Sequence, residues 1–128
     1  MSDDLFDKGM ATRKAVLGAE YVARAEANKT EFDKDWQNYV TEHAWGAVWT
    51  RPGLEKRVRS MLTIAMLASL GRLDELGAHI RATRNTGVTQ EEVKEVLLQV
   101  AVYAGAPAAN SAFAIAKRIY KEIETAGK

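Results

Sequence analysis

The chain has 128 residues, with 18 basic and 17 acidic side chains, so no strong overall charge favours nucleic acid or anionic lipid as a partner. Hydrophobic residues make up 47% and charged residues 27%, which is typical of a soluble globular protein, and we expect a single domain over residues 1–128. The absence of cysteine excludes a disulfide, a thiolate nucleophile and a zinc–thiolate site.

The N-terminal half shows the spacing of helices. The pattern predicts a first helix over residues 10–27, irregular at Gly18, and Thr30 is a predicted N-cap of a second helix. Apolar and aromatic residues then recur at three- and four-residue spacing. They are Phe32, Trp36, Tyr39, Val40 and His43. The turn at residues 51–53 contains Pro-Gly and separates this helix from a third, predicted over residues 54–70.

The middle of the chain contains clear helix ends. Residues 61–68 are apolar on nearly all sides, which predicts a helix buried centrally or in a subunit interface. Gly71 is a predicted left-handed stop for this helix. A fourth helix is predicted over residues 73–85, ending at Gly87.

Two further helices are predicted to complete the chain. Thr89 and Glu92 form a capping box that opens the fifth, and Pro107 suits the first turn of the sixth. Residues 96–116 carry no charge, but Gly105 and Pro107 interrupt them, which predicts two core helices and no membrane span. No segment alternates as a strand does, so we expect an all-α fold of about six helices.

The last two predicted helices are rich in alanine, so each buries little area against its neighbours. Together with the apolar third helix, this predicts that the core is completed by a second copy of the chain, and hence a homo-oligomer. The first residues lack the basic and apolar blocks of a signal peptide, which favours a cytoplasmic protein.

Residues 42–59 concentrate groups able to bind and enclose a small anion. Arginine binds a carboxylate through two parallel hydrogen bonds, and tryptophan supplies a flat apolar wall. The segment holds Glu42, His43, Trp45, Trp49, Arg51, Lys56, Arg57 and Arg59. This combination predicts a pocket for a small organic acid. The alternatives are a solvated basic helix face and a tryptophan pair, spaced four residues apart, that belongs to the core.

A second candidate group lies on the fourth predicted helix. Glu75 and His79 are four residues apart, which places them within about 60° of one helix face. We expect Glu75 to raise the pKa of His79 and favour a proton donor near neutral pH. The alternative is an ordinary surface Glu–His pair. Two histidines without ligand spacing do not indicate a metal site. Tyr103 could cap or fill a pocket.

Five segments resemble the carboxymuconolactone decarboxylase family, within the alkylhydroperoxidase D-like superfamily. They are WGAVWTRPGLEKRVRS (45–60), ELGAH (75–79), NTG (85–87), EEVKE (91–95) and YAGAPAAN (103–110). Alkylhydroperoxidase D carries Cys-x-x-Cys-x-x-x-His where this chain has Arg72, Glu75 and His79, so the thiol nucleophile is missing. Gln99 stands where many family members have histidine.

The resemblance implies an alkylhydroperoxidase D-like helical oligomer, a hexamer or trimer, that works without a cofactor or a metal. It further implies decarboxylation of 4-carboxymuconolactone to the 3-oxoadipate enol-lactone, in the protocatechuate branch of the β-ketoadipate pathway. This lactone carries its own electron sink, because the electron pair left by CO₂ can move through the ring double bond to the lactone carbonyl.

On this hypothesis the protein supplies anion binding, a wall against water and a proton. The residues assigned to carboxylate binding are Arg51, Arg57 and Arg59, and those assigned to the wall are Trp45, Trp49 and Tyr103. His79 would protonate the dienolate, with Glu75 or Glu42 poising the imidazole. The alternatives are a related lactone decarboxylase or isomerase on the same scaffold and a non-catalytic helical assembly protein.

Overall fold

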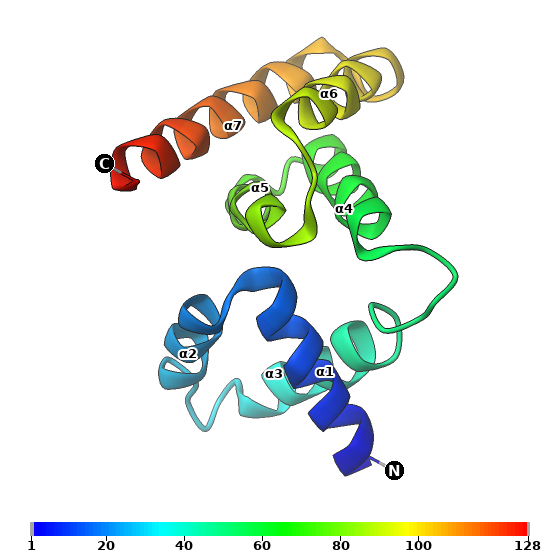
Figure 1. Ribbon diagram of the computed structural model, residues 1–128, viewed down its shortest axis with the longest axis vertical. Helices are drawn as coiled ribbons and strands as arrows, with labels where there is room; N and C mark the ends of the chain where they lie inside the picture. The colour runs from blue at the N-terminus through cyan, green and yellow to red at the C-terminus, as the bar shows by residue number, and fades with distance from the viewer. Residues whose placement is uncertain (1, 128) are drawn as a thin grey trace. The chain divides into compact units, whose positions relative to one another are not determined.

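The computed structural model describes residues 2–127 of the chain, and the side chains of residues 4–127. These residues form seven α-helices and one π-helical turn, without a strand (Figure 1). The helices are α1 (Ser2–Leu17), α2 (Ala19–Ala27), α3 (Lys34–Val40), α4 (Lys56–Leu70), α5 (Leu73–Thr86), α6 (Gln90–Ala104) and α7 (Ala106–Ala126), and the π-helical turn η1 is Thr41–Gly46. The prediction of an all-α fold is confirmed for these residues.

The chain divides into two compact units: Met1–Lys56, called here the N-terminal unit, and Arg57–Lys128, the C-terminal unit. The expected count of six helices was too low because Gly18, at φ 97° and ψ 142°, separates α1 from α2. A positive φ is cheap only for glycine, so Gly18 interrupts the helix that its neighbours would otherwise continue. The predicted irregularity is confirmed, and α1 begins at Ser2 rather than near Met10.

The predicted cap at Thr30 is wrong. The backbone N–H of Thr30 donates to the Asp33 carboxylate at 2.8 Å, and its hydroxyl donates to the same oxygen at 3.3 Å. This local side-chain bond closes a turn and delays the helix, so that α3 begins at Lys34. The helical path then continues from α3 into η1 through Thr41, which keeps helical dihedral angles.

Helix α1 and the turn η1 approach each other through backbone atoms. A Cβ atom added at Gly9 would lie 1.9 Å from the Thr41 carbonyl oxygen. A Cβ atom added at Gly46 would lie 2.4 Å from the Leu5 carbonyl oxygen. Only glycine leaves room for this contact, so two glycines determine how closely α1 and η1 pack.

The C-terminal unit is held by aliphatic side chains. Its core includes Ile64 from α4, Leu76 and Ile80 from α5, Leu97 from α6 and Ile119 from α7. Helices α6 and α7 lie side by side, and α7 also packs against α5 (Figure 1). Burial of these side chains is the main force that stabilises the unit.

The predicted helix ends of this unit are confirmed. Gly71 and Gly87 both have positive φ, and Gly87 ends α5 in the left-handed conformation. Thr89 and Glu92 form the complete capping box at the start of α6. Pro107 occupies the first turn of α7. Each of these features depends on residues close in the sequence, which is why it could be predicted.

Two apolar faces remain exposed. Helix α4 buries Ser60, Ile64 and Ala68 and leaves the opposite side open, so it is not buried on all sides within the C-terminal unit, and burial in a subunit interface stays a prediction. The exposed residues are Leu62, Met66 and Leu70 on α4, and Phe32, Trp36 and Tyr39 on and before α3. Among the described residues, no helix is long and apolar enough to cross a membrane.

Candidate active site

The two predicted wall tryptophans form part of the core of the N-terminal unit. Trp45 belongs to η1 and Trp49 follows one turn later, and both side chains are buried. Their rings stack with centroids 4.9 Å apart and planes inclined by 28°. An offset stack of this kind adds to the energy of burial. The sequence was compatible with either a pocket wall or a tryptophan pair in the core, and the burial of both rings favours the core pair.

The arginines that were predicted to bind carboxylates differ in their surroundings. Arg51 lies exposed in the loop after Trp49, and its backbone N–H donates to the Val48 carbonyl at 3.0 Å. Arg57, on the first turn of α4, forms an ion pair with Glu92. Arg59 is partly buried one turn from the helix start. A substrate carboxylate at Arg57 would therefore compete with a carboxylate of the protein.

Glu92 links the Arg57 ion pair to the start of α6. The backbone N–H of Thr89 and then the Arg57 guanidinium hold the pKa of the Glu92 carboxyl below its ordinary value. The same carboxylate accepts the Thr89 N–H at 3.0 Å in the capping box. Arg57 thus has a structural function in the C-terminal unit that the sequence spacing did not reveal.

His79 lies partly buried on α5, and its surroundings reverse an expectation. Burial lowers the pKa of His79 to about 4, while the nearby Glu75 carboxylate raises it by a smaller amount. The expected direction of the Glu75 effect is confirmed, but desolvation of the charged imidazolium outweighs the attraction of this exposed carboxylate, so the expectation of a raised pKa near neutral pH is wrong for the free protein. In the free protein the imidazole is neutral at pH 7.

A neutral imidazole can still act in catalysis. Its N–H can donate to an oxygen that becomes negative during a reaction, as in enzymes that use neutral histidine as an electrophile. It becomes a proton donor when a bound anion raises its pKa. His79 can therefore serve an anionic substrate in either way.

The turn η1 presents two polar side chains. Glu42 is partly exposed and His43 is exposed, and the Glu42 Oε2 lies 3.9 Å from the His43 Nε2. The Tyr39 ring packs against the imidazole with centroids 4.6 Å apart. About half of the His43 side chain, 52%, is in contact with solvent.

Tyr103 lies near the C-terminal end of α6 with 82% of its surface exposed. Val102 beside it is also exposed, so within the C-terminal unit Tyr103 does not fill a cavity. The predicted residues thus divide between the units. Glu42, Trp45, Trp49 and Arg51 belong to the N-terminal unit, and Arg57, Arg59, Glu75, His79 and Tyr103 belong to the C-terminal unit.

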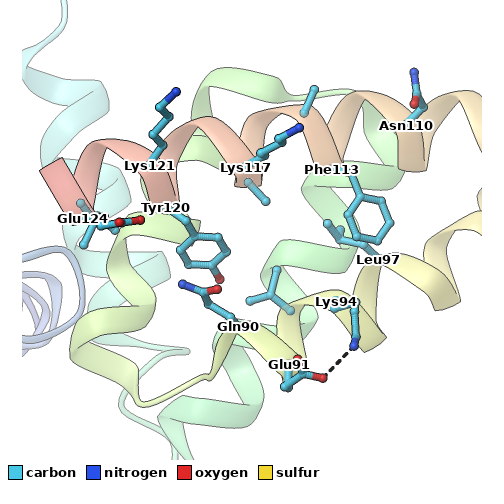
Figure 2. Close-up of a pocket in the computed structure, with 14 residues that line it drawn as sticks. Gln90, Glu91, Lys94, Leu97, Asn110, Phe113, Lys117, Tyr120, Lys121 and Glu124 are labelled. Carbon is cyan, nitrogen blue, oxygen red and sulfur yellow. Dashed lines mark ion pairs between the residues drawn. The ribbon is translucent and has the colours of Figure 1, made fainter.

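A groove of about 1060 Å³ lies between α6 and α7. In Figure 2, Tyr120 of α7 lies beside Gln90, and Phe113 lies beside Leu97. Burial raises the pKa of the Tyr120 phenol, and the Thr83 hydroxyl partly offsets this effect. None of the predicted site residues lines the groove, and its lining has no histidine. Glu91, Val93, Lys94 and Asn110 of its lining belong to two of the family motifs, and the other lining residues showed only helix periodicity in the sequence.

Among the residues that the structure describes, no three His, Cys, Asp or Glu side chains are grouped as metal ligands would be. The predicted site residues that can bind anions or transfer protons carry imidazole, carboxylate and guanidinium groups. This set can bind a small carboxylic acid, polarise a carbonyl oxygen and transfer a proton.

The chain belongs to the carboxymuconolactone decarboxylase family, whose sequence profile matches residues 34–118. It is 45% identical over 118 residues to the 4-carboxymuconolactone decarboxylase of Acinetobacter baylyi, covering 92% of this chain and 88% of that protein. It is 41% identical over 124 residues to the nitrosuccinic acid decarboxylase npaB of Metarhizium robertsii, covering 97% and 87%.

A third relative is an uncharacterized 15.0 kDa protein of Paracoccus denitrificans, 32% identical over 85 residues, covering 65% of this chain and 63% of that protein. The family resemblance inferred from the motifs is confirmed, and the chain is a decarboxylase. The alternative of a non-catalytic assembly protein is not supported.

Proposed function

We propose that this decarboxylase converts 4-carboxymuconolactone to the 3-oxoadipate enol-lactone in the protocatechuate branch of the β-ketoadipate pathway. The observation that supports this most strongly is the 45% identity to the Acinetobacter baylyi enzyme over 92% of the chain. The family profile covers parts of both units, which supports residues 1–128 acting as one functional domain.

The reaction depends on an electron acceptor within the substrate. The bond between the ring carbon and its carboxylate breaks, CO₂ leaves, and the electron pair moves through the ring double bond to the lactone carbonyl oxygen. A proton then adds to a ring carbon and gives the enol-lactone. The substrate itself stores the electron pair, so the proposed reaction uses no cofactor, and the protein has to stabilise the dienolate and deliver the proton.

The arginines are proposed to hold the acetate side chain of the lactone. Arg51 is exposed, and a guanidinium can bind a carboxylate through two parallel hydrogen bonds; Arg59 lies on the same helix as Arg57. Arg57 takes part only if the substrate shares it with Glu92. The departing carboxylate is less strongly paired than the acetate, because a strong ion pair would stabilise the ground state and slow the loss of CO₂.

His79 is proposed to stabilise and then protonate the dienolate. Two substrate carboxylates near the imidazole would raise its pKa from about 4 toward neutrality, in the same direction as Glu75. Glu75 and Glu42 are proposed as the catalytic carboxylates. Trp45, Trp49 and Tyr103 would exclude water and so favour the departure of neutral CO₂.

A cytoplasmic homo-oligomer, either a trimer or a hexamer, is also proposed. The supporting observation is the exposed apolar surface on α4 and at the end of α6. Exposed apolar faces of this kind are typical of surfaces that bind another protein. Sedimentation velocity at micromolar concentration would test the assembly, and a monomer would contradict it.

Nitrosuccinate is a second candidate substrate, favoured by the 41% identity over 97% of the chain. The two acids share a framework: one carbon carries the departing carboxylate, a carboxymethyl group and a link to an electron acceptor. The acceptor is a nitro group in nitrosuccinate and a conjugated carbonyl in the lactone. The same arginines and the same imidazole could therefore serve either acid.

The test is to follow both acids with purified protein, by the ultraviolet absorbance of the lactone and by release of CO₂. The proposal predicts loss of lactone with an equal amount of CO₂ and a kcat/KM above that for nitrosuccinate. Turnover of nitrosuccinate alone would favour the second candidate. Failure to convert either acid would contradict both.

A further inference from the structure

A buried arginine outside the predicted site joins three elements of the N-terminal unit. Arg13 of α1 is only 5% exposed. Its Nη1 donates to the Glu26 carboxylate of α2 at 3.3 Å and to the Thr41 hydroxyl of η1 at 3.5 Å. Its Nη2 donates to the Gln37 side-chain carbonyl of α3 at 3.3 Å. The planar guanidinium thus fixes α2, α3 and η1 relative to α1.

A buried cation is a costly way to hold helices together. Removing its charge from water costs several kcal/mol, and well-packed apolar residues often stabilise a core equally well. A guanidinium forms directional hydrogen bonds, which an apolar residue cannot form. These bonds require each acceptor to lie in the plane of the guanidinium at a set distance. The contacts of Arg13 therefore specify orientation more than they add stability.

These contacts fix the orientation of the π-helical turn η1 in particular. Thr41 accepts from Arg13, and its hydroxyl donates to the Gln37 carbonyl at 2.9 Å. Gly9 of α1 packs against the Thr41 carbonyl, and Gly46, at the far end of the turn, packs against Leu5. π-Helical turns are rare and occur frequently at functional sites. Both ends of η1 are thereby fixed against α1.

The same turn carries a partly exposed carboxylate. Thr41, Trp45 and Gly46 are buried, whereas the Glu42 side chain is 26% exposed. Glu42 follows Thr41 directly, so the backbone position that Arg13 fixes determines the direction in which the carboxylate points. The exposed imidazole of His43 lies 3.9 Å from this carboxylate.

We propose that Arg13 is a positioning residue of the decarboxylase, which holds η1 so that the carboxylate of Glu42 keeps its catalytic orientation. The inference rests on the proposed function, in which Glu42 is a catalytic carboxylate. Arg13 itself touches no substrate and acts only through Thr41 and the turn.

A double-mutant cycle in the complete protein tests this inference. The variants are Arg13→Met, Glu42→Gln and the two combined, assayed for kcat and KM with the lactone, or with nitrosuccinate if only that acid is converted. We expect each single variant to lower kcat by about tenfold with KM changed less than about threefold, and the double variant to be no slower than Glu42→Gln alone. Losses that multiply in the double variant would overturn the inference, and so would a Glu42→Gln variant with the kcat of the parent protein.

A milder variant covers the case in which Arg13→Met does not fold. Thr41→Val keeps the volume of the side chain and removes the oxygen that accepts from Arg13. It should lower kcat in the parent protein and have no further effect in the Glu42→Gln background. Thr41→Ser, which keeps the oxygen, should restore most of the kcat. Equal kcat for Thr41→Val and the parent protein would contradict the inference.

The matched control is Arg81→Met in the C-terminal unit, which removes the ion pair between Arg81 and Glu122. This variant should leave kcat unchanged in both backgrounds. The outcome also separates the two proposals. A parent protein that converts neither acid contradicts the proposed function, whereas an active parent whose variants combine multiplicatively contradicts only the role of Arg13.

Discussion

Around Gly9, two elements of the N-terminal unit touch through their backbones, whereas around Ile80 the helices of the C-terminal unit touch through aliphatic side chains. The first contact tolerates no added atom, and beside it lies the directional network of Arg13. The second contact is stabilised by apolar area, which has no preferred direction. Close backbone contact and directional hydrogen bonds therefore fix η1 in the N-terminal unit, whereas apolar burial is the main force that stabilises the C-terminal unit.

The largest difference in the free energy of unfolding is expected when a glycine is replaced by alanine in each unit. Gly9→Ala should destabilise the protein by more than about 3 kcal/mol, because its Cβ would lie 1.9 Å from the Thr41 carbonyl oxygen. Gly77→Ala on α5 should stabilise by about 0.5–1 kcal/mol, since its Cβ would meet only side-chain atoms at 3.6 Å or more and alanine favours the helix. Chemical denaturation measures both. Equal effects would contradict the comparison.

Truncation of an aliphatic side chain tests the other half of the comparison. Leu97→Ala in α6 should cost about 2–5 kcal/mol, because the side chain is fully buried in the core of the C-terminal unit. Leu98→Ala on the exposed side of the same helix is the matched control and should change the free energy of unfolding by less than about 0.5 kcal/mol. A similar loss in both variants would show that α6 is covered on both sides.

Substitution of His79 tests whether the C-terminal unit carries the proton donor. His79→Gln should lower kcat for the lactone by about a hundredfold or more, because general acid catalysis contributes an effect of that size. Glu75→Gln should cost only a few-fold, since Glu75 is the smaller influence on the pKa of His79. A near-normal rate for His79→Gln would exclude His79 from proton transfer.

The depressed pKa of His79 predicts a pH dependence of stability. Between the ordinary pKa of 6.5 and the folded value of about 4, the unfolded chain binds more protons at this residue than the folded chain. The contribution of neutral His79 to the free energy of unfolding is therefore complete above pH 6.5. As the pH falls to about 4, the free energy of unfolding decreases by at most about 3 kcal/mol. Melting temperatures at pH 7 and pH 4.5 should differ less in His79→Gln than in the parent. An unchanged difference would contradict the lowered pKa.

The smallest effect is expected at the exposed loop of the N-terminal unit. Arg51→Lys should raise KM for the lactone by roughly tenfold, because lysine cannot make the bidentate contact of a guanidinium. Lys56→Arg, at the exposed start of α4, is the control and should leave the kinetics unchanged. Parent-like kinetics for Arg51→Lys would mean that the arginine does not bind substrate.

The sequence predicted well what depends on neighbours in the chain. The capping box at Thr89, the left-handed end at Gly87 and the start of α7 at Pro107 each involve residues within one helical turn, so their interactions are the same in any surrounding. The family could also be recognised, because its motifs are short and continuous. At Thr30 the local prediction failed because Asp33 takes its N–H.

The features that only the tertiary structure determines involve residues far apart in the chain. The π-helical turn depends on Gly9 and Arg13 of α1, which lie about thirty residues before it and carry no local sign of the contact. The pKa of His79 follows from burial by the packing of the C-terminal unit, and the short-range effect of Glu75, which the spacing did reveal, is the weaker of the two. Neighbouring residues determine helix ends and motifs, whereas desolvation and close backbone contact exist only after distant segments have packed.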